Sequence, residues 1–126
     1  MLAPLVNRLL GTPFHLPTAL LARYPELARA RWRRGGLALR VGGWCLGLPT
    51  VSGITLWQTV SLAPGVALAP ELLLHELRHV EQFEDDRAFP LRYLWASVRH
   101  GYLDNPYEAD ARAFAARRLG GATPTA

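Results

Sequence analysis

The spacing of apolar residues predicts three helices in the second half of the chain. Between residue 70 and about residue 86, apolar side chains recur at intervals of three and four, the period of an amphipathic helix: Leu73, Leu77 and Val80. Pro70 suits the first turn of such a helix. Two more helices are expected over residues 91–100 and 105–119, because a proline stands at or near the start of each.

The first half of the chain predicts one helix followed by short strands. Residues 18–33 have apolar positions at helical spacing and end at two glycines, which are a strong stop signal. Residues 37–41 alternate, and residues 54–62 (ITLWQTVSL) are rich in β-branched and aromatic side chains, so both are predicted strands. These runs indicate an α+β fold with a short antiparallel or mixed sheet.

The composition indicates one globular domain over residues 1–126. With 126 residues, half of them hydrophobic, the chain can build one core but not two of ordinary size. The single cysteine, Cys45, excludes an intramolecular disulfide and a four-cysteine metal site. Because disulfides are rare in the reducing cytoplasm, a cytoplasmic protein is expected.

The net charge of +4 is unevenly distributed, and all 14 basic residues are arginines. Residues 1–40 hold seven arginines and one acid, whereas residues 41–126 hold seven arginines and nine acids. We therefore divide the domain into a basic N-terminal arm and helix, residues 1–36, and a mildly acidic remainder. A run of arginines is more often a solvated surface than a specific site, so nucleic acid is not an expected partner.

Residues 41–70 carry no charge and invite comparison with a membrane span. Glycines, prolines and polar residues interrupt this run before about 18 consecutive apolar residues accumulate, so no transmembrane helix is expected. The first ten residues, MLAPLVNRLL, lack the charged start and the cleavage site of a secretory signal. A peripheral contact of this apolar N-terminus with a membrane stays open.

The motif that carries chemistry lies in the predicted helix 70–86. Residues 75–79 read HELRH, the H-E-x-x-H pattern. Since residues four apart share one face of a helix, His75 and His79 could bind one metal ion, and Glu76 could reach a metal-bound water. The alternative interpretation is an exposed helix with two surface histidines.

A catalytic zinc site takes three protein ligands, which predicts a third ligand on another element. Glu108 is the candidate, because it would face inward beside small alanines that permit close helix approach. Glu108 also stands three residues after Asn105, where it could instead complete a capping box. We favour the ligand role, with Asp104 and Asp110 as weaker candidates.

These motifs resemble the gluzincin type of zinc metallopeptidase, and most closely its minimal members, the minigluzincins, and their bacterial relatives. The resemblance rests on H-E-x-x-H-x-x-Q and N-P-Y-E-x-x-A and covers roughly residues 50–118. It implies a zincin-like core over residues 37–119, followed by a tail, residues 120–126, that is expected to be disordered. One position departs from the family: where many gluzincins have an aspartate four residues after the ligand glutamate, this chain has Arg112.

The resemblance implies roles for individual residues. Zn²⁺ held by His75, His79 and Glu108 would activate water and polarise a peptide carbonyl, and Glu76 would pass the proton to the leaving amine. A peptide or unfolded-protein substrate would add to a strand by β-augmentation, along Ile54, Thr55, Leu56 and Trp57. The candidate donors to the oxyanion are Tyr102, Tyr107 and His100. Gln82 either holds a ligand histidine or is a solvated polar residue.

Three functions are therefore open, and the motifs favour the first, a zinc metallopeptidase. The second is a catalytically silent or latent zinc-binding domain of the same type, whose Arg-rich N-terminal helix could cover the cleft. The third is a metal-free module in which RARWRRGG, residues 29–36, contacts nucleic acid or an anionic surface, with Trp32 available for stacking.

Overall fold

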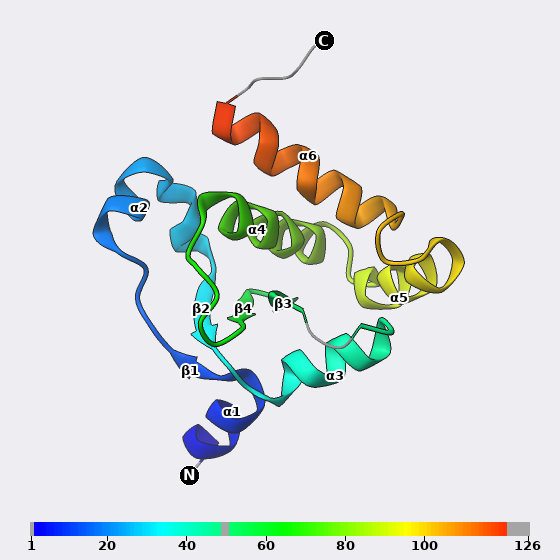
Figure 1. The fold of residues 1–126 in the computed structure, drawn as a ribbon, viewed down its shortest axis with the longest axis horizontal. Coiled ribbons are helices and arrows are strands. Elements are labelled where there is room, and N and C mark those ends of the chain that lie inside the picture. Colours follow the sequence, from blue (N-terminus) through cyan, green and yellow to red (C-terminus); the bar gives the residue numbers. More distant parts are fainter. Residues whose placement is uncertain (1, 49–50, 121–126) are drawn as a thin grey trace. The chain divides into compact units, whose positions relative to one another are not determined.

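The computed structural model describes residues 2–48 and 51–120 (Figure 1). Its helices and four-stranded mixed sheet confirm the predicted α+β class. The chain divides into two compact units, Met1–Ala67 and Leu68–Ala126, which are described one at a time. Of the predicted tail, Gly120 ends the last helix, and residues 121–126 lie outside the described part.

The first unit is built on the sheet, whose strand order is β1-β2-β4-β3. Strand β2 pairs in parallel with β4, while the other two pairs are antiparallel. Because β3 and β4 form a hairpin at one end of this order, β3 is an edge strand. The strands are β1 (Thr12–Pro13), β2 (Arg31–Arg34), β3 (Gly53–Leu56) and β4 (Thr59–Leu62).

Helical segments precede and connect the strands of this unit (Figure 1). They are α1 (Leu2–Leu10), α2 (Thr18–Arg23), the 3₁₀ helix η1 (Pro25–Arg29) and α3 (Leu37–Cys45). Leu27 from η1 and Val60 and Leu62 from β4 are fully buried, so they form part of the core.

The single helix predicted over residues 18–33 is corrected beyond Arg23, where the chain forms the short 3₁₀ helix η1 and then a strand. Pro25 disfavours a helical conformation at the preceding residue, and α2 ends there. The arginine-rich stretch that follows is strand β2, in which the buried Trp32 donates its indole N–H to the Leu27 carbonyl at 2.9 Å. The sequence did not reveal this strand because Trp32 is its only apolar residue, so there is no alternation of apolar and polar residues to detect.

Two strand predictions are also corrected. Residues 37–41 begin helix α3, because a short alternation cannot distinguish a strand from the start of a helix. Residues 54–62 form two strands instead of one, separated by a turn at Trp57. Trp57 has a φ of 57°, the left-handed conformation that a tight turn requires and that a bulky residue seldom adopts.

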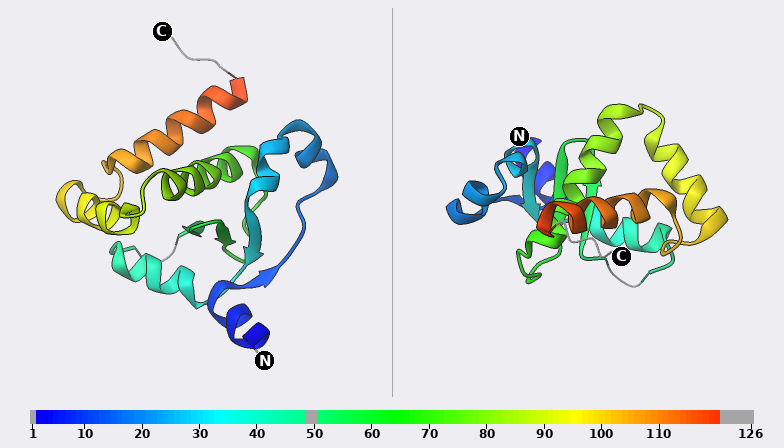
Figure 2. Two further views of the ribbon diagram at one scale, coloured as in Figure 1. Left: turned by 180° about the vertical axis from the view of Figure 1, so that it is seen from behind. Right: turned by 90° about the horizontal axis from the view of Figure 1, so that it is seen from above.

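The second unit consists of the three helices that the sequence predicts. They are α4 (Pro70–Asp85), α5 (Phe89–His100) and α6 (Pro106–Gly120). Helices α4 and α6 lie side by side and antiparallel, and α5 joins them at one end (Figure 2). The alanines at 111 and 115 are fully buried, and their small side chains permit this close approach.

Among the residues described, there is no helix with both the length and the apolar character needed to cross a membrane. The uncharged stretch of residues 41–70 accordingly contributes to α3, β3 and β4.

A candidate metal centre between α4 and α6

The two motif histidines and Glu108 meet in the second unit. His75 Nε2 lies 2.8 Å from Glu108 Oε1, and His79 Nε2 lies 3.1 Å from Glu108 Oε2. Glu76 is buried beside them, and the potential ligand atoms of His75, Glu76 and His79 all lie within 4.8 Å of one another. The spacing of the motif on α4 therefore brings three ionisable side chains to one point facing α6.

Asn105 determines where Glu108 lies. Its Oδ1 accepts the backbone N–H of Tyr107 at 2.8 Å, which caps the start of α6 as predicted. In a capping box the Glu108 side chain would accept the backbone N–H of Asn105. Here that N–H donates to the Tyr102 carbonyl at 3.3 Å, so the described residues do not form the box. Both Glu108 oxygens instead face the histidines, as the ligand interpretation requires.

Gln82 fixes the orientation of the His79 ring. Its Nε2 donates to the Tyr107 carbonyl at 3.1 Å and to the Asp110 carboxylate at 3.0 Å, and both partners only accept. Its Oε1 must therefore face His79 Nδ1, 2.7 Å away, and Nδ1 must carry the hydrogen. The Nε2 atom of His79 is left to face Glu108, which is the orientation that a metal ligand needs.

Asp110 supports this arrangement from the outer side. Its carboxylate accepts from Arg78 Nε at 2.7 Å as well as from Gln82, and these contacts lower the pKa of Asp110, that of Arg78 being the largest. Arg78 also bonds Glu81 at 2.7 Å and lies over the Phe114 ring. Asp110 thus contacts Gln82, which in turn contacts His79. Arg112, at the position that departs from the family pattern, donates to the Leu103 carbonyl instead.

Tyr93 on α5 belongs to the centre and was missed in the sequence. Its hydroxyl donates to Glu108 Oε2 at 2.5 Å, and its ring packs against His79 and Phe89. Phe89 and Tyr93 are four residues apart on the inward face of α5, a spacing that could have identified the pair. Burial, followed by the charge of Glu108, raises the pKa of Tyr93, so it remains a donor.

The electrostatics of the cluster favour a proton in the absence of metal. Burial opposes the charged form of His79, but the hydrogen bond to Glu108 and the charge of Glu76 outweigh it and raise the pKa of His79 to about 9. Burial likewise opposes ionisation of Glu108, but hydrogen bonds from His75, His79 and Tyr93 hold the pKa of that carboxyl well below its usual range. A metal ion binding here would replace the proton of His79.

The three predicted oxyanion donors lie in different surroundings. Burial, then the charges of Glu108 and Glu76, raise the pKa of Tyr102 to about 12, so Tyr102 is a protonated donor under the field of the cluster. The Tyr107 ring packs on Phe89, with ring centroids 5.1 Å apart. His100 is exposed at the end of α5. Of the three, Tyr102 is the one whose pKa shift registers the charges of Glu108 and Glu76. Asp104, a weaker ligand candidate, is exposed.

The predicted substrate strand lies in the first unit. Ile54, Thr55 and Leu56 belong to edge strand β3, and Trp57 belongs to the turn that follows. An edge strand offers backbone groups to an added strand, which is compatible with β-augmentation. The role of these residues stays a prediction.

The segment considered for nucleic-acid binding is partly engaged inside the first unit. Trp32 is buried, so the stacking interaction considered for it is wrong. Arg33 Nη1 donates to the Gly11 carbonyl and to Asn7 Oδ1, and Arg34 Nη1 donates to the carbonyls of Ala63 and Val66. These two arginines fasten backbone segments together within the first unit.

The donor set fits a zinc ion. Two imidazole nitrogens and a carboxylate are common zinc ligands, and ligand atoms about 2.0–2.1 Å from a tetrahedral zinc lie roughly 3.3 Å apart. The distances of 2.8 and 3.1 Å between the histidine nitrogens and Glu108 need only a small expansion to reach that separation. No protein-family model, curated protein or solved structure matches this chain, so the chemistry of the centre rests on its own residues.

Proposed function

We propose that this protein is a zinc-dependent metallopeptidase of the gluzincin type, with His75, His79 and Glu108 as the zinc ligands. The observation that carries the proposal is the convergence of both histidine Nε2 atoms on one buried carboxylate. Gln82 supports the proposal by fixing the His79 ring so that Nε2 faces Glu108, the orientation that a zinc ligand needs.

Zinc, when bound, supplies a Lewis acid that polarises a peptide carbonyl and acidifies water. The other steps belong to side chains of the chain. Glu76 accepts a proton from the attacking water and delivers it to the leaving amine. Tyr102, which keeps its proton, is the candidate donor to the developing oxyanion.

Metal content and hydrolysis of an unfolded protein test the proposal together. We expect one zinc per chain, lost in His75→Ala, His79→Ala and Glu108→Ala but kept in His100→Ala, the matched control on exposed α5 surface. Glu76→Gln should keep zinc while cleavage falls about 10²- to 10⁴-fold, the usual contribution of a general base.

The outcomes separate the competing functions. A chain that purifies and refolds without affinity for zinc would refute the proposal, and undiminished cleavage by Glu76→Gln would refute the assigned base. Stoichiometric zinc without cleavage of any peptide would favour the silent zinc-binding domain. Because the arginine-rich segment is a strand of the sheet, its removal would disrupt the first unit and cannot serve as a test of latency.

A further inference from the structure

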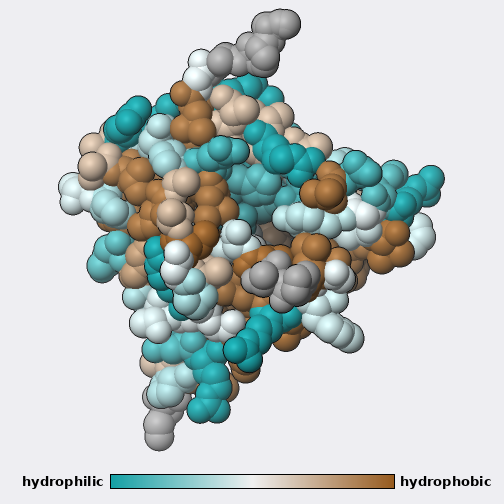
Figure 3. Space-filling model, viewed as in Figure 1, coloured by the Kyte–Doolittle hydropathy of each residue, from teal (hydrophilic) through white to brown (hydrophobic). Residues whose placement is uncertain are grey.

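Helix α5 carries apolar side chains on its outer face as well as on its inner face. Phe89 and Ala96 are buried on the inner side. The outer α5 stripe consists of residues at positions i, i+3, i+4 and i+7: Leu91, Leu94, Trp95 and Val98, which are 73%, 45%, 64% and 79% exposed. Hydrophobic residues reach the surface over α5 in Figure 3. A surface helix normally carries polar residues there, so this stripe indicates an interaction site.

The charge around the stripe has one sign. Residues 87–103 contain three arginines, one histidine and no acid, although residues 68–126 as a whole contain nine acids and seven arginines. Arg92 is paired with Asp86 at 3.0 Å. Arg99 makes no hydrogen bond or ion pair with any residue that the structure describes, and it lies on the exposed surface. An apolar stripe whose own helix carries cationic groups and no acid, with Arg99 unpaired among the described residues, is complementary to an anionic, partly apolar surface.

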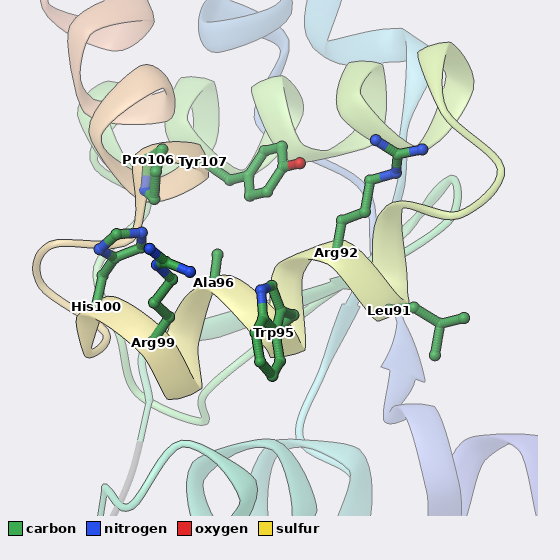
Figure 4. Close-up of a pocket in the computed structure, with 8 residues that line it drawn as sticks. All are labelled: Leu91, Arg92, Trp95, Ala96, Arg99, His100, Pro106 and Tyr107. Carbon is green, nitrogen blue, oxygen red and sulfur yellow. The ribbon is translucent and has the colours of Figure 1, made fainter.

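A pocket of about 620 Å³ lies beside the stripe, between α5 and the start of α6. Arg99 and His100 gather at one end of it and Arg92 at the other, with Trp95 and Tyr107 between them (Figure 4). Guanidinium and imidazole donors suit the oxygens of a phosphate, and the aromatic rings suit the glycerol and upper acyl region of a lipid.

We propose that the outer α5 stripe docks on the surface of a bilayer containing anionic phospholipid, with a headgroup phosphate held beside Arg99 and His100. Leucine, tryptophan and valine penetrate the boundary between headgroups and acyl chains, while the arginines remain at the level of the phosphates. Nucleic acid would leave the aliphatic residues of the stripe in water, which argues against it. The proposal does not depend on the metal centre.

Co-sedimentation of the full chain with vesicles tests this surface. We expect binding to vesicles of phosphatidylcholine mixed with phosphatidylglycerol, and little binding to phosphatidylcholine alone. Arg99→Gln should weaken binding about fivefold, the contribution of one basic residue near a charged surface, and Arg99→Lys should restore it. Val98→Ser should weaken binding roughly tenfold, because the buried aliphatic area is lost.

Matched variants outside α5 control for charge and for hydrophobicity. Arg117→Gln on α6 removes the same charge from another exposed position, and Val41→Ser on α3 makes the same change at an exposed valine of the first unit. Both should bind vesicles like the parent chain. All four positions are exposed, so thermal unfolding of each variant should match that of the parent.

Four results would overturn the proposal. One is equal binding to the neutral and anionic vesicles, and another is weakening by the control variants as large as that caused by the α5 variants. The third is an Arg99-dependent affinity for soluble glycerol phosphate without vesicle binding. The fourth is a dimer that Val98→Ser dissociates without vesicle binding. These last outcomes would assign the surface to a free anion or to a second copy of the chain.

Discussion

Gln82 is the side chain that decides which nitrogen of His79 is available. The Gln82 amide has an N–H₂ donor and a carbonyl acceptor. Because the two groups around Gln82 Nε2 are both acceptors, the amide can adopt only one orientation. The imidazole Nδ1 therefore donates to Gln82, and Nε2 faces Glu108. The carboxylate of Asp110 accepts a hydrogen bond from this amide. Helix α6 therefore supplies both the proposed ligand, Glu108, and the residue that holds Gln82 in place.

Replacing Gln82 with leucine should weaken zinc binding about 10- to 100-fold, the usual effect of losing an outer hydrogen bond to a ligand histidine. Leucine fills a similar volume but leaves His79 Nδ1 without its acceptor. Competition with a chromogenic chelator would measure the zinc affinity. Gln58→Leu, the same substitution at an exposed turn residue of the first unit, is the control and should not change it. Equal affinities in the two variants would contradict the role of Gln82.

The residues of the centre differ in how far the sequence could predict them. Helical spacing alone brings His75, Glu76 and His79 together, because the motif spans little more than one helical turn. The contact of Glu108 with both histidines depends on how α6 packs on α4, which no local pattern in the sequence specifies. Local spacing could have placed Tyr93 on the inward face of α5 with Phe89, but its contact with Glu108 depends on the packing of two helices and has no local pattern.

At the scale of elements, the helices of the second unit were predictable, whereas only α2 of the described α-helices in the first unit lies where a helix was predicted. Helices α4, α5 and α6 begin at or next to prolines and carry regular apolar positions, so local sequence and packing agree. Strand β2 has a buried tryptophan among arginines, and those arginines bond distant backbone carbonyls. Such long-range partners override local propensity, which is why the segment was assigned to a helix.

Asn105 connects element structure with the site, which makes Asn105→Ala informative. The residue is fully buried, caps α6 and donates to Ser97 Oγ at 2.8 Å. Loss of the cap and of a buried partner should reduce the free energy of unfolding by about 2 kcal/mol. Because Glu108 stands in the first turn of α6, zinc affinity should fall as well. Urea unfolding and a chelator competition measure the two effects.

Asn7→Ala is the matched control for that experiment. Asn7 is half-buried on α1 and accepts from Arg33 at 3.0 Å, so the variant also loses a side-chain hydrogen bond. It should destabilise the chain by less and should not change zinc affinity. If Asn105→Ala bound zinc as tightly as Asn7→Ala, the helix cap would not position Glu108.

At the scale of the whole molecule, charge and architecture divide the chain in different ways. The sequence separates a basic arm, residues 1–36, from the rest, whereas the sheet of the first unit unites both sides of that boundary. Strand β2 from the arm pairs in parallel with β4, and Arg34 bonds the carbonyls that follow β4. Parallel pairing over a long connection leaves no local trace in sequence, so this union could not be anticipated.

The bonds of Arg33 and Arg34 have a consequence for how the protein tolerates acid and alkali. A guanidinium keeps its charge at all accessible pH values, and its partners here are carbonyl oxygens and an asparagine amide, which do not titrate. The contacts between α4 and α6, by contrast, depend on the protonation of His79 and Glu108. Shifts of pH should therefore loosen the second unit before these contacts of the first.

The pKa changes of His79 and Glu108 in the metal-free chain give the direction in which pH changes the stability of the second unit. Because the pKa of His79 is raised, its contribution to folding stability is full below the ordinary value of 6.5 and is lost as the pH rises through about 9. The lowered pKa of Glu108 means that its contribution is full above 4.5 and is lost as the pH falls. Hydrogen exchange with a chelator present should accelerate in α4 and α6 at both extremes, while β2 stays protected. Faster exchange in β2 first would show that the arginine bonds do not confer this tolerance.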